Sequence, residues 1–273
     1  MIQNSAVLVD LNISVWTGRK MDKRVSEQVD ASNNTKTRAG NYHKKLLAGT
    51  AALDSLHAVV GKVRQWHYDN TLPWADNGAR LLPMANFFDY KATLGDFKTM
   101  FYSTSEEFYG QYNDLVSAAA FTLGDLFNSN DYPALEDIRK KNSLRVTFSP
   151  VPDSGDFRVD IPEEYRKELE AISQERIDSA MKDAWTRLHD CLKHMSTKLA
   201  GEQKQVFRDT LVTNATDLCN ILSKLNVTND PKLEQARRQL ESALIGIDAA
   251  ELRKSDNVRL DVKTRVDEIL NMF

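Results

Sequence analysis

The region from residue 162 to 273 most constrains the fold, because its long stretches of helical periodicity carry charged residues on most of their surface. We expect helices at about 162–199, 204–225, 231–244 and 258–273. Pro162 followed by Glu163 and Glu164 is typical of a helix start. Helices this polar bury too little apolar surface alone, so they must pack together or against another subunit. We therefore expect a helical bundle and a homo-oligomer, either a dimer or a tetramer.

Two other regions carry β-strand signals. The run 6–16 is rich in β-branched residues and alternates at its end, which predicts a short N-terminal strand. Apolar residues alternate with polar ones on either side of the turn-like composition at 152–156, which predicts one β-hairpin near 143–161. This β signal is far smaller than the five strands of an OB barrel require, so an OB fold is not expected.

The rest of the N-terminal half has helical patterns. The stretch from about Arg19 to Tyr68 is helical with an interruption near 32–34, and Pro73 and Pro83 then indicate a loop that ends near Tyr90. The stretch 94–127 is helical again. Its rings recur at helical spacings: Phe97, Phe101, Phe108, Tyr112 and Phe121. Core packing is expected for them rather than base stacking, since the surrounding carboxylates repel phosphate.

The expected fold class is therefore mainly α: long helices packed as a bundle, with a short N-terminal strand and one hairpin. Two regions are expected. Residues 1–161 form an N-terminal helical region with an aromatic-rich core and the hairpin, and residues 162–273 form a C-terminal helical region. One continuous domain is the alternative.

Charge is segregated along the chain, although its net charge is only −3. Residues 1–70 carry ten Lys/Arg against six Asp/Glu, whereas residues 71–138 carry three against ten. Aromatic rings, among them Trp16, Tyr42 and Trp66, lie between the N-terminal cations. A cationic track with stacking rings is what a single-stranded nucleic-acid site needs. The alternative is that these charges only solvate helix surfaces.

The candidate nucleic-acid-binding residues lie in this N-terminal track and in a second basic cluster before the predicted hairpin. They are Arg19, Lys20, Lys23, Arg24, Lys36, Arg38, Tyr42, Lys44, Lys45, Arg64, Trp66, Arg139, Lys140, Lys141 and Arg145. Trp66, at a helix end before the Pro-containing loop, is the ring expected to stack on a base. Packing beneath that loop is the alternative for Trp66.

Signatures of catalysis are missing from the sequence. It has no glycine-rich phosphate loop, Rossmann fingerprint, zinc-protease helix or paired-cysteine metal pattern. His189 and His194 would lie about 140° apart around a helix, so the two cannot face one metal ion without partners elsewhere. We therefore expect no enzymatic activity, no catalytic residues, no metal and no cofactor.

The cysteine content and hydropathy indicate a cytoplasmic protein. Cys191 and Cys219 are too few for a disulfide framework, as is typical of a reducing compartment. No window approaches the ~18 uninterrupted apolar residues of a membrane span, and the N-terminus lacks the pattern of a secretion signal. No membrane association is expected.

The run Val9-Asp10-Leu11-Asn12-Ile13-Ser14-Val15-Trp16-Thr17-Gly18-Arg19-Lys20, with the later Leu72-Pro73-Trp74 and Arg80-Leu81-Leu82-Pro83, resembles an uncharacterised family of phage and mobile-element proteins. Within it, the chain is most similar to the single-stranded-DNA-binding RNA polymerase cofactors of podoviruses that package a giant virion RNA polymerase. The match is specific over about the first ninety residues, and afterwards only the order of elements supports it.

This resemblance implies a phage early protein in the host bacterial cytoplasm that binds single-stranded DNA and helps a phage RNA polymerase to start at its promoters. A role in replication is left open. The family supplies no catalytic residues and no motif for the DNA contacts. The alternative function is an oligomeric helical scaffold or adaptor for a protein machine, without nucleic-acid binding.

Overall fold

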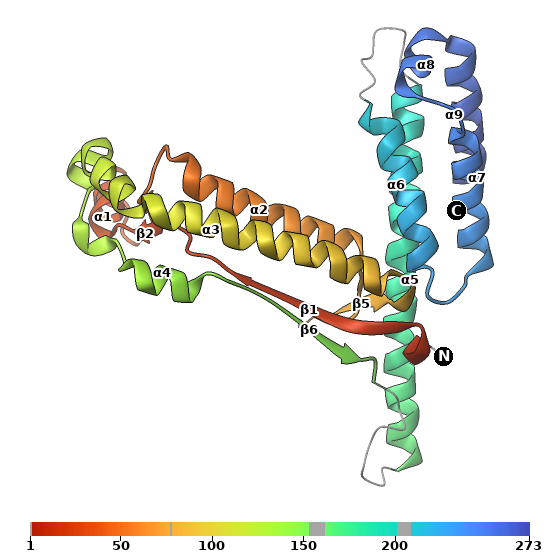
Figure 1. Ribbon diagram of the computed structural model, residues 1–273, viewed down its shortest axis with the longest axis horizontal. Helices are drawn as coiled ribbons and strands as arrows, with labels where there is room; N and C mark the ends of the chain where they lie inside the picture. Colours follow the sequence, from red (N-terminus) through yellow and green to blue (C-terminus); the bar gives the residue numbers. More distant parts are fainter. Residues whose placement is uncertain (1, 77, 153–161, 201–208) are drawn as a thin grey trace. The chain divides into compact units, whose positions relative to one another are not determined.

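The computed structural model describes residues 2–76, 78–152, 162–200 and 209–273 (Figure 1). These residues form nine α-helices and a small number of short strands, so the predicted mainly α fold class is confirmed. None of the described helices combines the length and the apolarity needed to cross a bilayer.

Packing groups the chain into two compact units. Unit 1 comprises Met1–Asp10, Trp66–Lys91 and Thr147–Phe273, and unit 2 comprises Leu11–Gln65 and Ala92–Val146. This grouping differs from the expected boundary after residue 161, because the N-terminal segment and the segment after Gln65 share a core with the C-terminal helices.

The C-terminal helices of unit 1 form the expected bundle. Their bounds are α5 (Glu163–Leu199), α6 (Thr210–Leu225), α7 (Pro231–Leu244), α8 (Ala249–Lys254) and α9 (Asp256–Leu270). Helix α5 contacts α6 and α9, and α7 contacts the same two helices (Figure 1). Leu188, Leu222 and Leu240 are fully buried in their shared core. The apolar faces of these helices therefore pack against one another within the chain.

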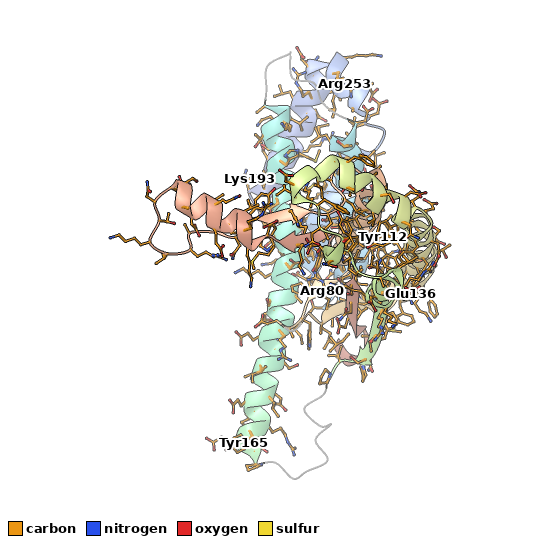
Figure 2. All side chains as sticks on the ribbon, turned by 90° about the vertical axis from the view of Figure 1, so that its left-hand side faces the viewer. Arg80, Tyr112, Glu136, Tyr165, Lys193 and Arg253 are labelled. Atoms are coloured by element: carbon orange, nitrogen blue, oxygen red, sulfur yellow. The ribbon has the colours of Figure 1, made fainter. Side chains whose placement is uncertain are left out.

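The first half of α5 differs from its second half. No residue from Glu163 to Ser179 is buried, and the buried series begins at Ala180. Figure 2 shows Tyr165 near one end of this helix and Lys193 farther along it. The 37-residue length of α5 thus exceeds what the bundle covers.

The main sheet has the strand order β4-β5-β1-β6. Its strands are β1 (Ala6–Ser14), β4 (Leu72–Pro73), β5 (Arg80–Pro83) and β6 (Ser143–Pro150), and β5 is antiparallel to both β1 and β4. The predicted N-terminal strand is confirmed. The predicted loop between Leu72 and Tyr90 is partly wrong, because it contains two short strands. Proline is tolerated there, since Pro73 lies on an edge strand and Pro83 ends its strand.

The predicted hairpin near 143–161 falls partly outside the described residues. Its first half is β6, whose neighbour in the sheet is β1. The residues expected to form its second strand, 157–161, are not described.

Unit 2 contains a second, two-stranded sheet that the helical pattern did not predict. Strand β2 (Arg19–Met21) pairs antiparallel with β3 (His43–Lys45), and α1 (Lys23–Ser32) lies between them in sequence. Asp22 caps α1, because its Oδ1 accepts a hydrogen bond from the backbone N–H of Val25 at 3.1 Å. The prediction of helix from about Arg19 onward is therefore wrong at both strands, because a pairing across more than twenty residues leaves no local periodicity.

Trp16 anchors the core of unit 2. Its ring stacks on Phe108 at a centroid distance of 6.1 Å and meets the edge of Tyr112 at 5.8 Å, and its carbonyl oxygen lies 3.1 Å from His57 Nε2. These partners belong to α3 (Phe87–Leu123) and α2 (Ala51–Asp69). Helix α4 (Leu135–Lys141) completes the helices of the unit.

The predicted aromatic core of α3 is correct for its middle and wrong near its end. Phe101, Phe108 and Tyr112 are buried, whereas Phe121 is 91% exposed. Phe121 lies three residues before Gly124, where the backbone has a φ of +51° and the helix has ended. Helical spacing alone therefore did not show that the core stops before Phe121.

Candidate nucleic-acid interface

The second sheet has four Lys/Arg among its six residues, 19–21 and 43–45, which we call the basic ribbon. Arg19 pairs with Lys45, Lys20 with Lys44, and Met21 with His43. Arg19, Lys20 and Lys45 are exposed. Directly opposite residues of antiparallel strands have Cβ atoms about 4.5–5.5 Å apart, and like charges placed so are destabilising. Across the described residues, no carboxylate pairs with Arg19, Lys20 or Lys45.

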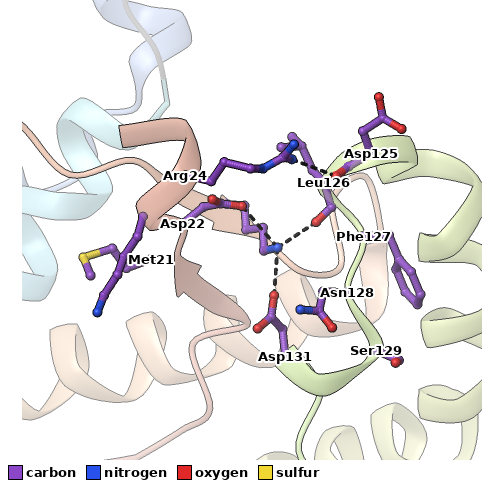
Figure 3. A pocket seen from close by; sticks show the side chains of 11 residues that line it. Met21, Asp22, Arg24, Asp125, Leu126, Phe127, Asn128, Ser129 and Asp131 are labelled. Atoms are coloured by element: carbon purple, nitrogen blue, oxygen red, sulfur yellow. Dashed lines mark hydrogen bonds and ion pairs between the residues drawn. The ribbon is translucent and has the colours of Figure 1, made fainter. Parts of the chain in front are cut away.

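Lys44 is the exception within the ribbon, because its side chain is buried. Its Nζ lies 2.7 Å from Asp131 Oδ2 and 3.4 Å from Asp22 Oδ2, and it donates to the carbonyl oxygen of Leu126 at 2.7 Å (Figure 3). Burial by itself lowers the pKa of Lys44, but the bonds and charges of the two carboxylates outweigh it and raise that pKa above its usual value. Lys44 is thus a charged interior residue and not part of an exposed cationic surface.

A pocket of about 600 Å³ adjoins Lys44 (Figure 3). Lys23, Arg24 and Lys44 line it together with Asp22, Asp125 and Asp131, so its cations and carboxylates are equal in number. Arg24 donates to the carbonyl oxygen of Asp125 at 2.9 Å. The pocket therefore offers no excess positive charge to an anion.

The exposed segment after α1 carries three further candidate residues. Arg38 pairs with Glu27 at 3.3 Å and Asp30 at 3.8 Å, which fastens this segment to α1. Lys36 and Tyr42 are exposed in the same segment, and Lys23 is exposed in the first turn of α1. The structure therefore leaves Lys23 and Lys36 accessible to a ligand, whereas Arg38 serves to hold the segment.

The second basic cluster is divided by its partners. Arg139 donates to both carboxylate oxygens of Glu106, at 2.6 and 2.9 Å, and its guanidinium lies 4.3 Å from the ring centroid of Tyr109. Lys140 lies 3.9 Å from Asp137. Lys141 and Arg145 are exposed, and the described residues provide neither with a carboxylate partner. Of the candidates elsewhere in unit 2, Arg64 donates to the carbonyl oxygen of Ile13 at 3.1 Å.

Trp66 belongs to unit 1 and is half-buried. Its ring lies parallel to that of Tyr90, at a centroid distance of 4.5 Å and an angle of 25°. The next residue, His67, is buried with Nδ1 2.7 Å from the Tyr90 hydroxyl, and burial lowers its pKa to about 4. His67 is therefore neutral near pH 7 and adds no positive charge beside Trp66.

Sequence reasoning missed a series of rings in unit 1 that begins at Trp66 and Tyr90. Phe87, Phe88 and Phe148 continue the contacts of Trp66 and Tyr90, and Phe88 is 78% exposed. The signal was the adjacent pair Phe87-Phe88 at the start of a helix, since successive side chains point about 100° apart around a helix and one ring of such a pair can face solvent.

Other reactive chemistry is limited among the described residues. No three His, Cys, Asp or Glu side chains there come together as a metal site. Burial raises the pKa of the Cys191 thiol to about 11 and that of Cys219 to about 12, so both are protonated near neutral pH. No family model, curated protein or solved structure matches this chain.

Proposed function

We propose that this protein binds single-stranded DNA without strong sequence preference and acts as a cofactor of a phage RNA polymerase in early or middle transcription. The observation that carries the proposal is the basic ribbon, in which exposed Arg19 and Lys45 lie directly opposite each other. Such a pair is destabilising on its own and is relieved when a phosphate binds between the two cations.

The surroundings of the ribbon support this proposal. Residues 11–65 carry ten Lys/Arg and only four Asp/Glu, and three of those carboxylates, Asp22, Glu27 and Asp30, are already paired with Lys44 or Arg38. The Debye length is ~8 Å at physiological salt, so more distant carboxylates oppose a polyanion only weakly.

The polymerase part of the proposal rests on the sequence resemblance. The run that carries it, from Val9 to Lys20, ends on Arg19 and Lys20 of the ribbon. The resembled segment and the exposed cations thus coincide.

The test is the salt dependence of oligo(dT) binding, followed by fluorescence anisotropy. For single strands, log affinity falls with log salt by about 0.7 for each phosphate contacted. The double variant Arg19→Ala/Lys45→Ala should bind more weakly, with a slope smaller by about 1.4 if each cation contacts one phosphate. The matched control is Lys232→Ala/Lys254→Ala, which removes the same charge from exposed positions in unit 1. Absence of salt-dependent binding in the wild-type protein would overturn the proposal.

A second measurement compares strand forms at one salt concentration. Single strands should bind more tightly than duplex DNA of the same sequence, because stacking rings need free base faces. Equal affinity for both forms would indicate binding to the phosphate backbone alone.

A scaffold or adaptor function remains the second candidate, and one observation favours it. In the first half of α5, where no described residue is fully buried, Tyr165 is 59% exposed and Ile172 is 39% exposed, and the two lie seven residues apart on one face of the helix. A scaffold without a nucleic-acid site would show no binding in the salt series, and Tyr165→Ala/Ile172→Ala would then change its association in sedimentation.

A further inference from the structure

We propose that unit 1 carries a base-stacking surface, made by the exposed ring of Phe88 together with Phe87 and Lys91, that receives unstacked nucleobases. This inference rests on the proposed single-stranded DNA binding and names the part of the ligand that unit 1 recognises. Phe88 and Lys91 were not among the residues expected from sequence.

Five rings of unit 1 contact one another in series. Trp66 stacks on Tyr90 at 4.5 Å between centroids, Tyr90 meets Phe148 at 6.3 Å, Phe148 meets Phe87 at 5.3 Å, and Phe87 meets Phe88 at 5.6 Å. The angles for the last three pairs are 85°, 66° and 82°, so these rings meet edge to face. The series therefore fixes the orientation of each ring through its neighbour.

Burial differs sharply between Tyr90, within this series, and Phe88, at its end. Tyr90 is 1% exposed, which packing explains. Phe88 is 78% exposed, so packing in the core does not explain why an aromatic residue occupies this position. A phenylalanine held by its neighbour with most of its surface in solvent is a preordered surface for a flat apolar group.

Charge near Phe88 suits a nucleotide. The Nζ of Lys91 lies 5.6 Å from the ring centroid of Phe87, and no carboxylate among the described residues pairs with Lys91. The adjacent carboxylate, Asp89, lies 2.7 Å from Lys224 Nζ, which also donates to Asn86 at 3.3 Å. Asp89, the acid that follows Phe88 in the sequence, is thus paired with a cation, and Lys91 is available to the phosphate that follows a stacked base.

The residues around Phe88 favour a base over a large apolar partner. Ala85, Asp89 and Lys91 are exposed, so Phe88 is flanked mainly by small or charged side chains. Met84 is 41% exposed and extends the surface by one polarizable side chain. Stacking on such a surface accepts any base, because every base has an aromatic face.

The experiment separates bases from phosphates. An oligo(dT) strand and an abasic strand of equal length carry the same phosphates, but only the first can stack. The wild-type protein should prefer oligo(dT) by about five- to hundredfold, the range that stacking of one base supplies. Phe88→Ala should remove most of this preference and leave the affinity for the abasic strand unchanged.

Two further variants serve as controls. Phe121→Ala removes an even more exposed phenylalanine, 91% against 78% for Phe88, from unit 2 and should leave the preference intact. Phe88→Tyr retains a ring and should retain the preference. Because Phe88 contributes little burial, thermal melts of Phe88→Ala should match those of the wild-type protein.

Each remaining outcome decides against the stacking surface, and one of them also decides against the proposed function. Equal wild-type binding of both strands, or an unchanged preference in Phe88→Ala, overturns the stacking surface while single-strand binding through the ribbon stands. Failure to bind either strand overturns the proposed function and the inference together. An unchanged preference combined with altered sedimentation of Phe88→Ala would assign the surface to contact between copies of the chain and overturn its role in stacking.

Discussion

Lys44 and Lys45 are neighbours in β3 and yet have opposite surroundings. Lys44 points into unit 2. Its ammonium group forms ion pairs there with Asp22 and Asp131 and donates a hydrogen bond to the carbonyl oxygen of Leu126. Lys45 is exposed opposite Arg19, and no described carboxylate pairs with it. The comparison shows that positive charge counted along a sequence is not the same as charge available to a ligand. Successive side chains of a strand point to opposite faces, which is why one of the two neighbouring lysines is buried and the other is exposed.

The same distinction divides the second basic cluster. Arg139 and Lys140 have carboxylate partners, whereas Lys141 and Arg145 are exposed and no described carboxylate pairs with them. A surface for a polyanion is therefore defined by the cations that the protein leaves unneutralised.

The largest expected effect is on stability. Lys44→Met should lower the free energy of unfolding by ~3 kcal/mol, because it leaves the carboxylates of Asp22 and Asp131 mostly buried without their cation. The matched change Lys45→Met should alter it by less than about 0.5 kcal/mol, as is usual for an exposed side chain. Urea denaturation measures both. Similar losses in the two variants would contradict the assignment of interior and exterior lysines.

The next effect concerns the glycine that leads the chain from Trp16 into the ribbon. Gly18 has a φ of +62°, and a Cβ there would collide with Cδ2 of Leu53. Gly18→Ala should therefore destabilise the protein by about 1–3 kcal/mol. Gly61→Ala is the control, because Gly61 lies inside α2 with open space around it and alanine favours a helix by ~1 kcal/mol. Thermal unfolding should shift downward for the first variant and upward for the second.

A smaller effect is the dependence of stability on pH. The pKa of Lys44 is raised in the folded protein from 10.5, so its ion pairs stabilise fully below pH 10.5 and are lost as pH rises through the folded pKa. The pKa of Asp22 is lowered from 3.8, chiefly by the backbone bond from Val25, so its contribution is present above pH 3.8 and lost as pH falls through the folded pKa. In urea titrations, Lys44→Met should lose the alkaline dependence and Lys45→Met should keep it.

The smallest effect is on the salt dependence of binding by the second cluster. If only unneutralised cations contact phosphate, Lys141→Ala/Arg145→Ala should reduce the salt slope by up to about 0.7 for each contact. Arg139→Ala/Lys140→Ala removes the same charge from paired positions and should change the slope less. Equal changes would show that ion pairing within the protein does not withhold a cation from DNA.

The sequence alone predicted the N-terminal strand and, among the described C-terminal helices, α5, α6, α7 and α9, but not the short α8. Pro162 precedes α5 at Glu163, and Pro231 is the first residue of α7, because capping chemistry acts within a few residues of a helix end. The β-branched run 6–16, which alternates at its end, likewise predicted β1. The buried middle of α3 followed from the spacing of Phe101 and Phe108. Each of these features depends on neighbours in the chain.

Other features were decided only by tertiary structure. Arg19 and Lys45 are 26 positions apart, and no local pattern shows that they become cross-strand partners. In the sequence, Lys44 resembles the neighbouring lysines. Its ion pair with Asp131, more than eighty positions away, is visible only in the structure. The sequence therefore identified the candidate cations. It did not show which of them remain available to a phosphate. Local periodicity follows from backbone geometry, whereas the neutralisation of a charge depends on which distant group the fold brings within a few ångströms.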